Sequence, residues 1–162
     1  MVSSQSWTSA AAYMGAVTWG NGNTGIAGVV SASNSLVGST GVDLVGNGGV
    51  TALTNGNYVV RSGFWDGTAA DVGAVTWRSG TSGVAALVST SNSLVGSVTS
   101  ANPQPVVADD INGTFFARFV DEGGGRVRLG SQADGIAPTL GAVSSANVTM
   151  VSADISGSVA VG

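Results

Sequence analysis

Apolar and polar residues alternate over short stretches of the chain, which is the pattern of β-strands that turn one face toward a core. In the stretch 73–77, Val75 and Trp77 fall on one face, and Ala74 and Thr76 on the other. Similar stretches are bounded by Gly, Asn, Asp and Ser, which favour tight turns. No amphipathic stretch of helical length competes with them. The pattern predicts an all-β protein, whose middle part has strands at 49–53, 58–62, 73–77, 84–88 and 93–96.

The pair Asn55-Gly56 lies between two of these strands. Asn-Gly is the pair that most readily adopts the positive φ angles of a type I′ turn, so we expect a β-hairpin there. The pair Asn112-Gly113 occurs further along the chain, which indicates a turn that belongs to a repeating plan.

The sequence repeats itself with a period of 58 residues. Trp7 recurs as Trp65, the motif GAVTW of 15–19 recurs at 73–77, and the motif NSLVGS of 34–39 recurs at 92–97. A third, diverged copy contains NGTFFAR, which is similar to NGNYVVR in the second. We therefore divide the chain into a partial first repeat at 1–45, a second repeat at 46–103 and a diverged third repeat at 104–162, for which a capping role is expected.

The stretch 73–77 has one bulky and one small face, and a small face lets a neighbouring sheet approach closely. The expected architecture is a series of tandem repeats of 58 residues that form propeller-like antiparallel sheets, with a β-solenoid as the alternative. Propellers need about four to eight blades, so three repeats are not expected to close a ring. In this arrangement the tryptophans are either core residues or platforms on which a sugar could stack.

Composition narrows the chemistry that the chain could perform. Its 162 residues include 26 Gly but no Cys, His or Lys, and only 9% are charged. Without the usual general bases and nucleophiles we expect no enzyme, no catalytic residue and no cofactor. The net charge of −4, without a basic cluster, argues against nucleic acid as a partner. No stretch reaches the roughly 18 apolar residues of a membrane span, so membrane insertion is not expected.

Charged residues gather between 109 and 134. Carboxylates gather in one region only, as two acidic pairs at 109–110 and 121–122. A calcium ion would need roughly six to eight oxygens that converge on it. The spacing does not promise such convergence, so no metal site is predicted and a metal here is only the alternative. We expect the carboxylates instead to form salt bridges with nearby arginines, namely Arg118, Arg126 and Arg128.

The phrases NSLVGS, VTALTNGNYVVRS and FWDGTAADVGAVTW resemble repeats of unassigned function in large bacterial surface proteins of the filamentous-haemagglutinin type. They are more distantly similar to the FG-GAP blades of integrin-α-type β-propellers. The likeness covers residues 7 to about 100. It implies a surface location, and in FG-GAP blades it implies a calcium loop rich in Asp. Residues 54–57 stand at that place without a carboxylate, so the resemblance does not carry calcium to this chain.

The function that these observations favour is that of an extracellular or cell-surface structural or adhesive protein, although no signal peptide is visible in the sequence. Residues 148–161 alternate like a strand and carry almost no charge, so they would form a sticky edge. Open sheet edges would let copies of the chain associate into a filament or ring. The alternative is a small glycan-binding, lectin-like module that contacts surface glycans. The candidate assembly or ligand contacts are Trp7, Trp65, Val148, Met150, Ile155 and Val159.

Overall fold

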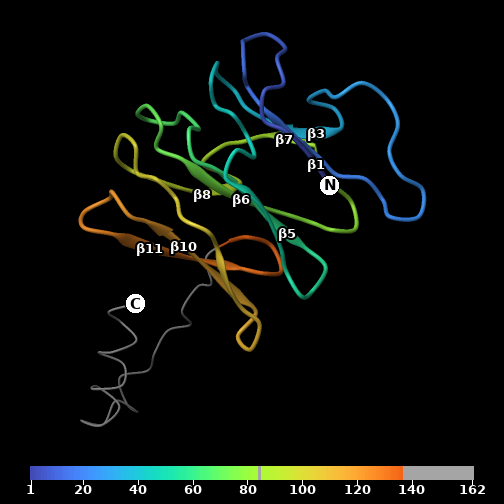
Figure 1. Ribbon diagram of the computed structural model, residues 1–162. Coiled ribbons are helices and arrows are strands. Elements are labelled where there is room, and N and C mark those ends of the chain that lie inside the picture. Colours follow the sequence, from blue (N-terminus) through green and yellow to red (C-terminus); the bar gives the residue numbers. More distant parts are fainter. Residues whose placement is uncertain (84, 137–162) are drawn as a thin grey trace.

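A computed structural model describes residues 1–83 and 85–136 of the chain. The regular elements of these residues are eleven β-strands in three sheets, without a helix (Figure 1). The expectation of an all-β protein is thereby confirmed. Nowhere in the described ranges is there a helix that could span a membrane.

The first sheet has the strand order β1-β2-β3-β7, and the second has the order β4-β5-β6-β8. Strands β1, β2 and β3 are the counterparts of β5, β6 and β8 one period later. The strands of the first sheet are β1 (Val2–Ser4), β2 (Ala16–Thr18), β3 (Ser35–Val37) and β7 (Ala86–Leu87). Those of the second are β4 (Gly49–Ala52), β5 (Tyr58–Ser62), β6 (Ala74–Arg78) and β8 (Ser93–Val95).

The third sheet has the order β11-β10-β9, and all its pairs are antiparallel. Its central strand β10 corresponds to β5, since both follow an Asn-Gly turn and are preceded by a paired strand. The strands are β9 (Val107–Asp109), β10 (Thr114–Phe119) and β11 (Arg126–Ser131).

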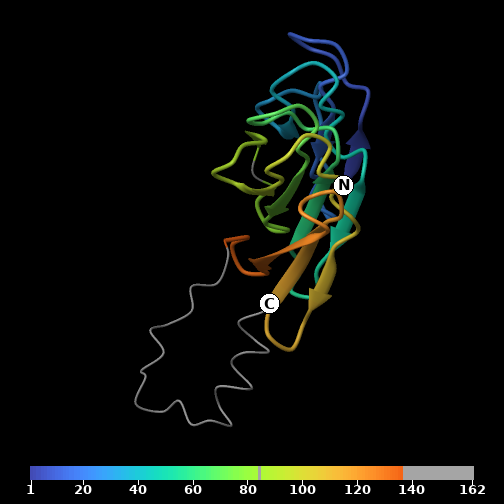
Figure 2. The ribbon, with the colours of Figure 1, turned by 90° about the vertical axis from the view of Figure 1, so that its left-hand side faces the viewer.

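The sheets stack in layers, with a hydrophobic core in each gap (Figures 1 and 2). One core joins the first two sheets through Val17 and Leu36 on one side and Val60 and Ala74 on the other. The other core joins the second and third sheets through Val59, Val75 and the ring of Phe115, among others. The middle sheet is therefore covered on both faces.

The alternation in β6 places its side chains as the sequence predicts. Ala74 packs into the core shared with the first sheet, whereas Val75 and Trp77 pack into the core shared with the third. The small face thus meets one neighbouring sheet and the bulky face meets the other. Burial on both sides explains why β6 carries apolar residues on both of its faces.

The described residues form several antiparallel sheets, as expected, but these build neither a closed barrel nor a ring of blades. The sheets are not purely antiparallel either, since β3 and β7 run parallel. The parallel pair arises because β7, which belongs to the second repeat, pairs with β3 in the sheet of the first repeat. A strand shared between repeats links successive layers, which favours a stack over separate blades.

The expected hairpin is present between β4 and β5, but its turn is not of type I′. Gly56 has a φ of 87°, while Asn55 does not have a positive φ, as that turn would require. Gly56 N–H donates to Leu53 O at 3.0 Å, and Leu53 N–H donates to Asn57 O at 2.8 Å, which closes a longer loop. Asn55 is instead held by the third repeat, since its Nδ2 donates to Gln132 O at 2.8 Å.

Candidate assembly interface

The joint between the first two repeats is made by a strand that crosses from one to the other. In β7, Ala86 lies opposite Leu36 and Leu87 lies opposite Val37, in a parallel pair. Val88 N–H extends this pair by donating to Val37 O at 3.0 Å. The second repeat thereby completes the sheet of the first.

Trp19 marks one end of this joint. Gly83 of the second repeat lies against its indole, so closely that a Cβ on Gly83 would fall 2.4 Å from Trp19 Cε3. The next joint is built in the same way. There Gly135 lies against Trp77, where a Cβ would fall 2.5 Å from Trp77 Cβ, and Trp77 Nε1 donates to Gln132 O at 2.8 Å. A glycine in a turn of each following repeat therefore covers the tryptophan of the preceding one.

The two joints differ beside the Ser-Leu-Val strand that both repeats contain. In the first repeat all three residues of β3 are buried, and Leu36 is only 2% exposed. In the second repeat the same three residues form β8 and are only partly buried. Strand β8 pairs with β6 on one side, and its other edge has no strand partner within the described residues. The free edge accounts for the difference in burial.

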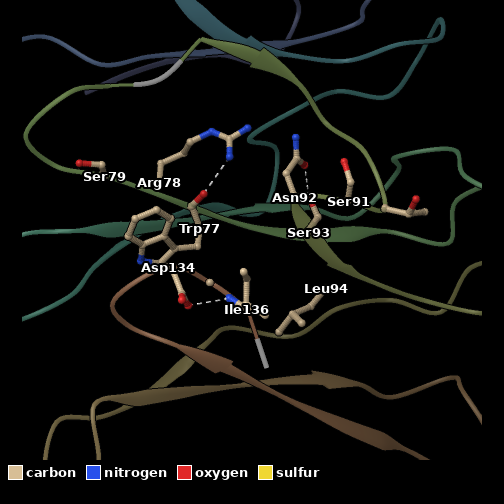
Figure 3. Close-up of a pocket in the computed structure, with 11 residues that line it drawn as sticks. Trp77, Arg78, Ser79, Ser91, Asn92, Ser93, Leu94, Asp134 and Ile136 are labelled. Carbon is tan, nitrogen blue, oxygen red and sulfur yellow. Dashed lines mark hydrogen bonds between the residues drawn. The ribbon is translucent and has the colours of Figure 1, made fainter. Parts of the chain in front are cut away.

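A cavity of about 450 Å³ lies beside this free edge (Figure 3). Its lining includes Trp77 and Arg78 of β6, Asn92 and Leu94 at β8, and Ile136 of the third repeat. In the first joint, the corresponding place next to β3 is taken by β7. The cavity is thus the counterpart of a slot that a parallel strand fills elsewhere in the same molecule.

Arg78 is buried at the rim of this cavity. Its Nη1 donates to Trp77 O at 3.0 Å, while its Nε and Nη2 have no hydrogen-bond partner among the residues that the structure describes. Burial lowers the pKa of the Arg78 guanidinium, and the same burial raises the pKa of the neighbouring Tyr58 hydroxyl. The guanidinium thus lies in a place where few of its donors find a partner among the described residues.

A second sheet edge is open at β1, which pairs only with β2 in the described part of the chain. Its counterparts β5 and β10 each carry a further strand on that side, namely β4 and β9. Among the described residues no strand takes this place in the first sheet, and Val2 of β1 is exposed.

Buried carboxylates close the loops at the joints. The Asp43 carboxylate accepts hydrogen bonds from Ser39 N–H and Thr40 N–H, at 2.7 and 2.9 Å, and from Asp66 N–H of the second repeat at 3.0 Å. In the second repeat the position of Asp43 is taken by Ala101, which has no carboxylate. There Glu122 of the third repeat accepts hydrogen bonds from Ser97, the counterpart of Ser39.

Glu122 also binds two arginines, as the sequence predicts for this region. Arg128 donates to both carboxylate oxygens, at 2.9 and 2.8 Å, and Arg126 lies 3.3 Å away. The hydrogen bonds from Arg128, more than those from Ser97, lower the pKa of Glu122 to about 2 against the burial that would raise it. Arg118 has no salt bridge within the described residues, so the expected ladder is smaller than predicted.

The two acidic pairs do not converge. Asp109 ends β9 opposite the first residue of β10, and Asp110 follows it, whereas residues 121–122 follow the other end of β10, about 20 Å along a strand of six residues. Asp110 accepts a bond from Thr54 at 2.8 Å instead. In the described ranges no group of three or more acidic side chains is placed to hold a metal ion.

The candidate contact residues are placed very differently by the fold. Trp65 is 4% exposed and belongs to the core between the first two sheets, so it is not available to a ligand or a second chain. Trp7, its counterpart, is only half-buried. The four remaining candidates lie outside the described residues: Val148, Met150, Ile155 and Val159. Sequence reasoning missed the edge of β8, because its motif is identical to that of β3, which is covered.

A family model described as "Repeat of unknown function (DUF5650)" matches residues 1–47 and 52–103, which is more than half of the chain. Searches of curated proteins and of solved structures find no match. None of these comparisons supports the likeness to haemagglutinin-type exoproteins or to FG-GAP blades. The two matched segments contain the two copies of the Ser-Leu-Val strand and the joint between them. The chain belongs to the family of DUF5650 repeats.

Proposed function

We propose that the chain is a non-catalytic structural or adhesive repeat protein, exposed outside the cell, that associates with copies of itself through open sheet edges. The observation that carries the proposal is the joint between the first two repeats, where β7 of one repeat completes the sheet of the other. A repeat that binds its neighbour by adding a strand has the means to bind a repeat of another chain in the same way.

Each of the three sheets has two edge strands in the described part of the chain, and two of these edges, at β1 and at β8, lie where a neighbouring repeat carries a further strand. Little charge opposes such pairing, since only 9% of the residues are charged. Natural sheets protect their edges with lysine or proline, and the chain contains no lysine. The residues Val148, Met150, Ile155 and Val159 remain further candidates for the contact.

The test is the mass and shape of the purified chain, measured by light scattering and negative-stain imaging over a concentration series. The proposal expects mass to rise with concentration and rings or filaments to form. A chain that lacks residues 148–162 is expected to assemble less, if the C-terminal candidates contribute. A monomer at every concentration would overturn the proposal.

The cavity beside Trp77 favours a second candidate function, namely a small glycan-binding module. An indole next to polar side chains such as Ser91 and Asn92 is a common way to hold a sugar ring. Saturable quenching of tryptophan fluorescence by an oligosaccharide, lost in Trp77→Ala, would support this candidate. An unchanged fluorescence with a broad set of oligosaccharides would exclude it.

A further inference from the structure

Residues 24–30 of the first repeat are the counterpart of the segment that contains β7, but they join none of the sheets that the structure describes. One period separates Gly28 from Ala86 and Val29 from Leu87. Residues 22–29 are all exposed, and Val29 is 87% exposed although it is apolar. In the described structure no strand pairs with this segment.

The segment is nevertheless restrained by contacts that its counterpart also makes, although Gly28 has a φ of 113° and its counterpart Ala86 has no positive φ. Asn34 Nδ2 donates to Val29 O at 3.0 Å, just as Asn92 Nδ2 donates to Leu87 O at 2.8 Å. The turn before it is also shared. Gly25 N–H donates to Asn21 O at 2.7 Å, and one period later Gly83 N–H donates to Ser79 O at 3.3 Å. Bonds that already restrain a segment reduce the conformational entropy that it loses when it binds.

We propose that Gly28–Val29 of one chain adds as a parallel strand to the free edge of β8 in a second copy. The register follows from the first joint, so Gly28 lies opposite Leu94 and Val29 lies opposite Val95. The added strand fills the cavity beside β8 and buries the half-exposed Ser-Leu-Val residues, as β7 does for β3. The inference rests on the proposed self-association and names the surfaces that carry it.

The sequence argues that a second copy, and not the following segment of the same chain, provides this strand. Gly135 contacts Trp77 as Gly83 contacts Trp19, and this equivalence aligns Pro138 with Ala86. Ala86 lies in the parallel ladder with Leu36. Proline has no N–H to donate to a ladder, whereas Gly28 and Val29 each have one.

Such a contact joins unlike surfaces, because the donor lies in the first repeat and the acceptor lies in the second. Head-to-tail contacts of this kind produce a ring if the rotation between chains closes, and a filament if it does not. Each chain would contribute one donor and one acceptor, so no chain in the interior of a filament would keep a free β8 edge.

The experiment is disulfide trapping, which suits a chain without cysteine. Chains carrying Val29→Cys are mixed with chains carrying Val95→Cys under mild oxidation, and the same mixture is followed by light scattering. Opposite residues of paired strands lie within the distance that a disulfide spans. The double variant Val37→Cys with Leu87→Cys in one chain is the positive control, since these residues are paired within the molecule. Chains carrying Val127→Cys, on the exposed part of β11, replace the Val95→Cys chains as the negative control.

A covalent dimer of the unlike chains, absent from the negative control, is the expected result. If the mixture assembles and the positive control closes, but no such dimer forms, then the inference is overturned while self-association stands. An internal disulfide in a single chain with Val95→Cys and Thr139→Cys would also overturn it, because the chain's own segment would then fill the slot. If no sample assembles at any concentration, the proposed function itself fails.

A charge at the donor gives an independent test. Val29→Asp is expected to weaken association at least about tenfold, because the carboxylate would be buried against β8. The matched control is Val127→Asp, which places the same charge at another exposed valine and is expected to leave association unchanged. Equal effects of the two substitutions would contradict the proposal.

Discussion

Gly83 of the second repeat lies flat against the indole of Trp19 in the first, where a Cβ would fall 2.4 Å from Cε3 and 2.6 Å from Cγ. Gly135 holds the same relationship to Trp77 at the next joint. No other residue type could come so close to the ring without moving it. The pair therefore determines how tightly one repeat docks on the next.

Gly83→Ala is expected to lower the free energy of unfolding by about 2–4 kcal/mol, because the methyl group overlaps Trp19 and the residue has a φ of 50°. Gly56→Ala is the matched control, since Gly56 has a φ of 87° but no atom near the added Cβ. It should cost only about 1 kcal/mol. Urea unfolding of both variants measures the difference, and equal costs would show that the contact with Trp19 is unimportant.

Trp65→Ala is expected to cost about 3–5 kcal/mol, because the indole fills the core between the first two sheets. Trp7→Ala removes the same side chain from the same place in the first repeat, where it is only half-buried. Its cost should be below about 2 kcal/mol. Thermal unfolding of the two variants checks this ranking. A larger loss of stability for Trp7→Ala than for Trp65→Ala would contradict it.

Asp43→Ala should destabilise the fold by about 2–4 kcal/mol. The substitution removes a buried carboxylate and leaves the N–H groups of Ser39, Thr40 and Asp66, whose bonds to it are part-buried, without their acceptor. Asp109→Ala removes a carboxylate that bonds Asn112 in an exposed turn, and it should cost about 1 kcal/mol or less. Denaturant titrations that give both variants the same midpoint would refute the special role of Asp43.

Stability should fall as the pH is lowered from about 4.5 to about 2, and Glu122 should be a main cause. Hydrogen bonds from Arg128 hold the pKa of its carboxyl at about 2, below the ordinary value of 4.5. Because the folded state binds the proton more weakly than the unfolded state, protonation favours unfolding in this interval and has no such effect above it. The contribution that is lost is on the order of 3 kcal/mol.

The matched variant for this prediction is Glu122→Gln, which keeps the shape of the side chain without its titration. It should be less stable than the parent chain at pH 7, and its stability should change less between pH 4.5 and pH 2. Denaturant midpoints at a series of pH values measure both slopes. Parallel slopes would mean that other carboxylates control acid unfolding.

The strands of the second repeat could be predicted within one or two residues, because alternation and flanking glycines are local properties. The predicted strand at 73–77 is β6, at Ala74–Arg78, and the predicted strand at 84–88 contains β7. The partner of β7 could not be predicted. Nothing in its few residues distinguishes pairing with its own repeat from pairing with the preceding one, since that choice depends on how the sheets stack.

The turn at Asn55-Gly56 illustrates the same limit. Its position could be predicted from the Asn-Gly pair, but the sequence did not reveal that the Asn55 side chain bonds Gln132 O of another repeat. The acidic residues behave similarly, since a spacing in sequence does not reveal that the two acidic pairs lie at opposite ends of β10.

The sequence alone determined that this protein is built of tandem β-repeats with a period of 58 residues, because strand alternation, turn residues and internal repetition are all written in the order of the residues. Only the tertiary structure decided that two identical Ser-Leu-Val strands differ, one covered and one with a free edge. The physical reason is that a hydrogen-bonding edge is satisfied by whichever strand lies beside it in space, and that neighbour is fixed by the packing of whole sheets.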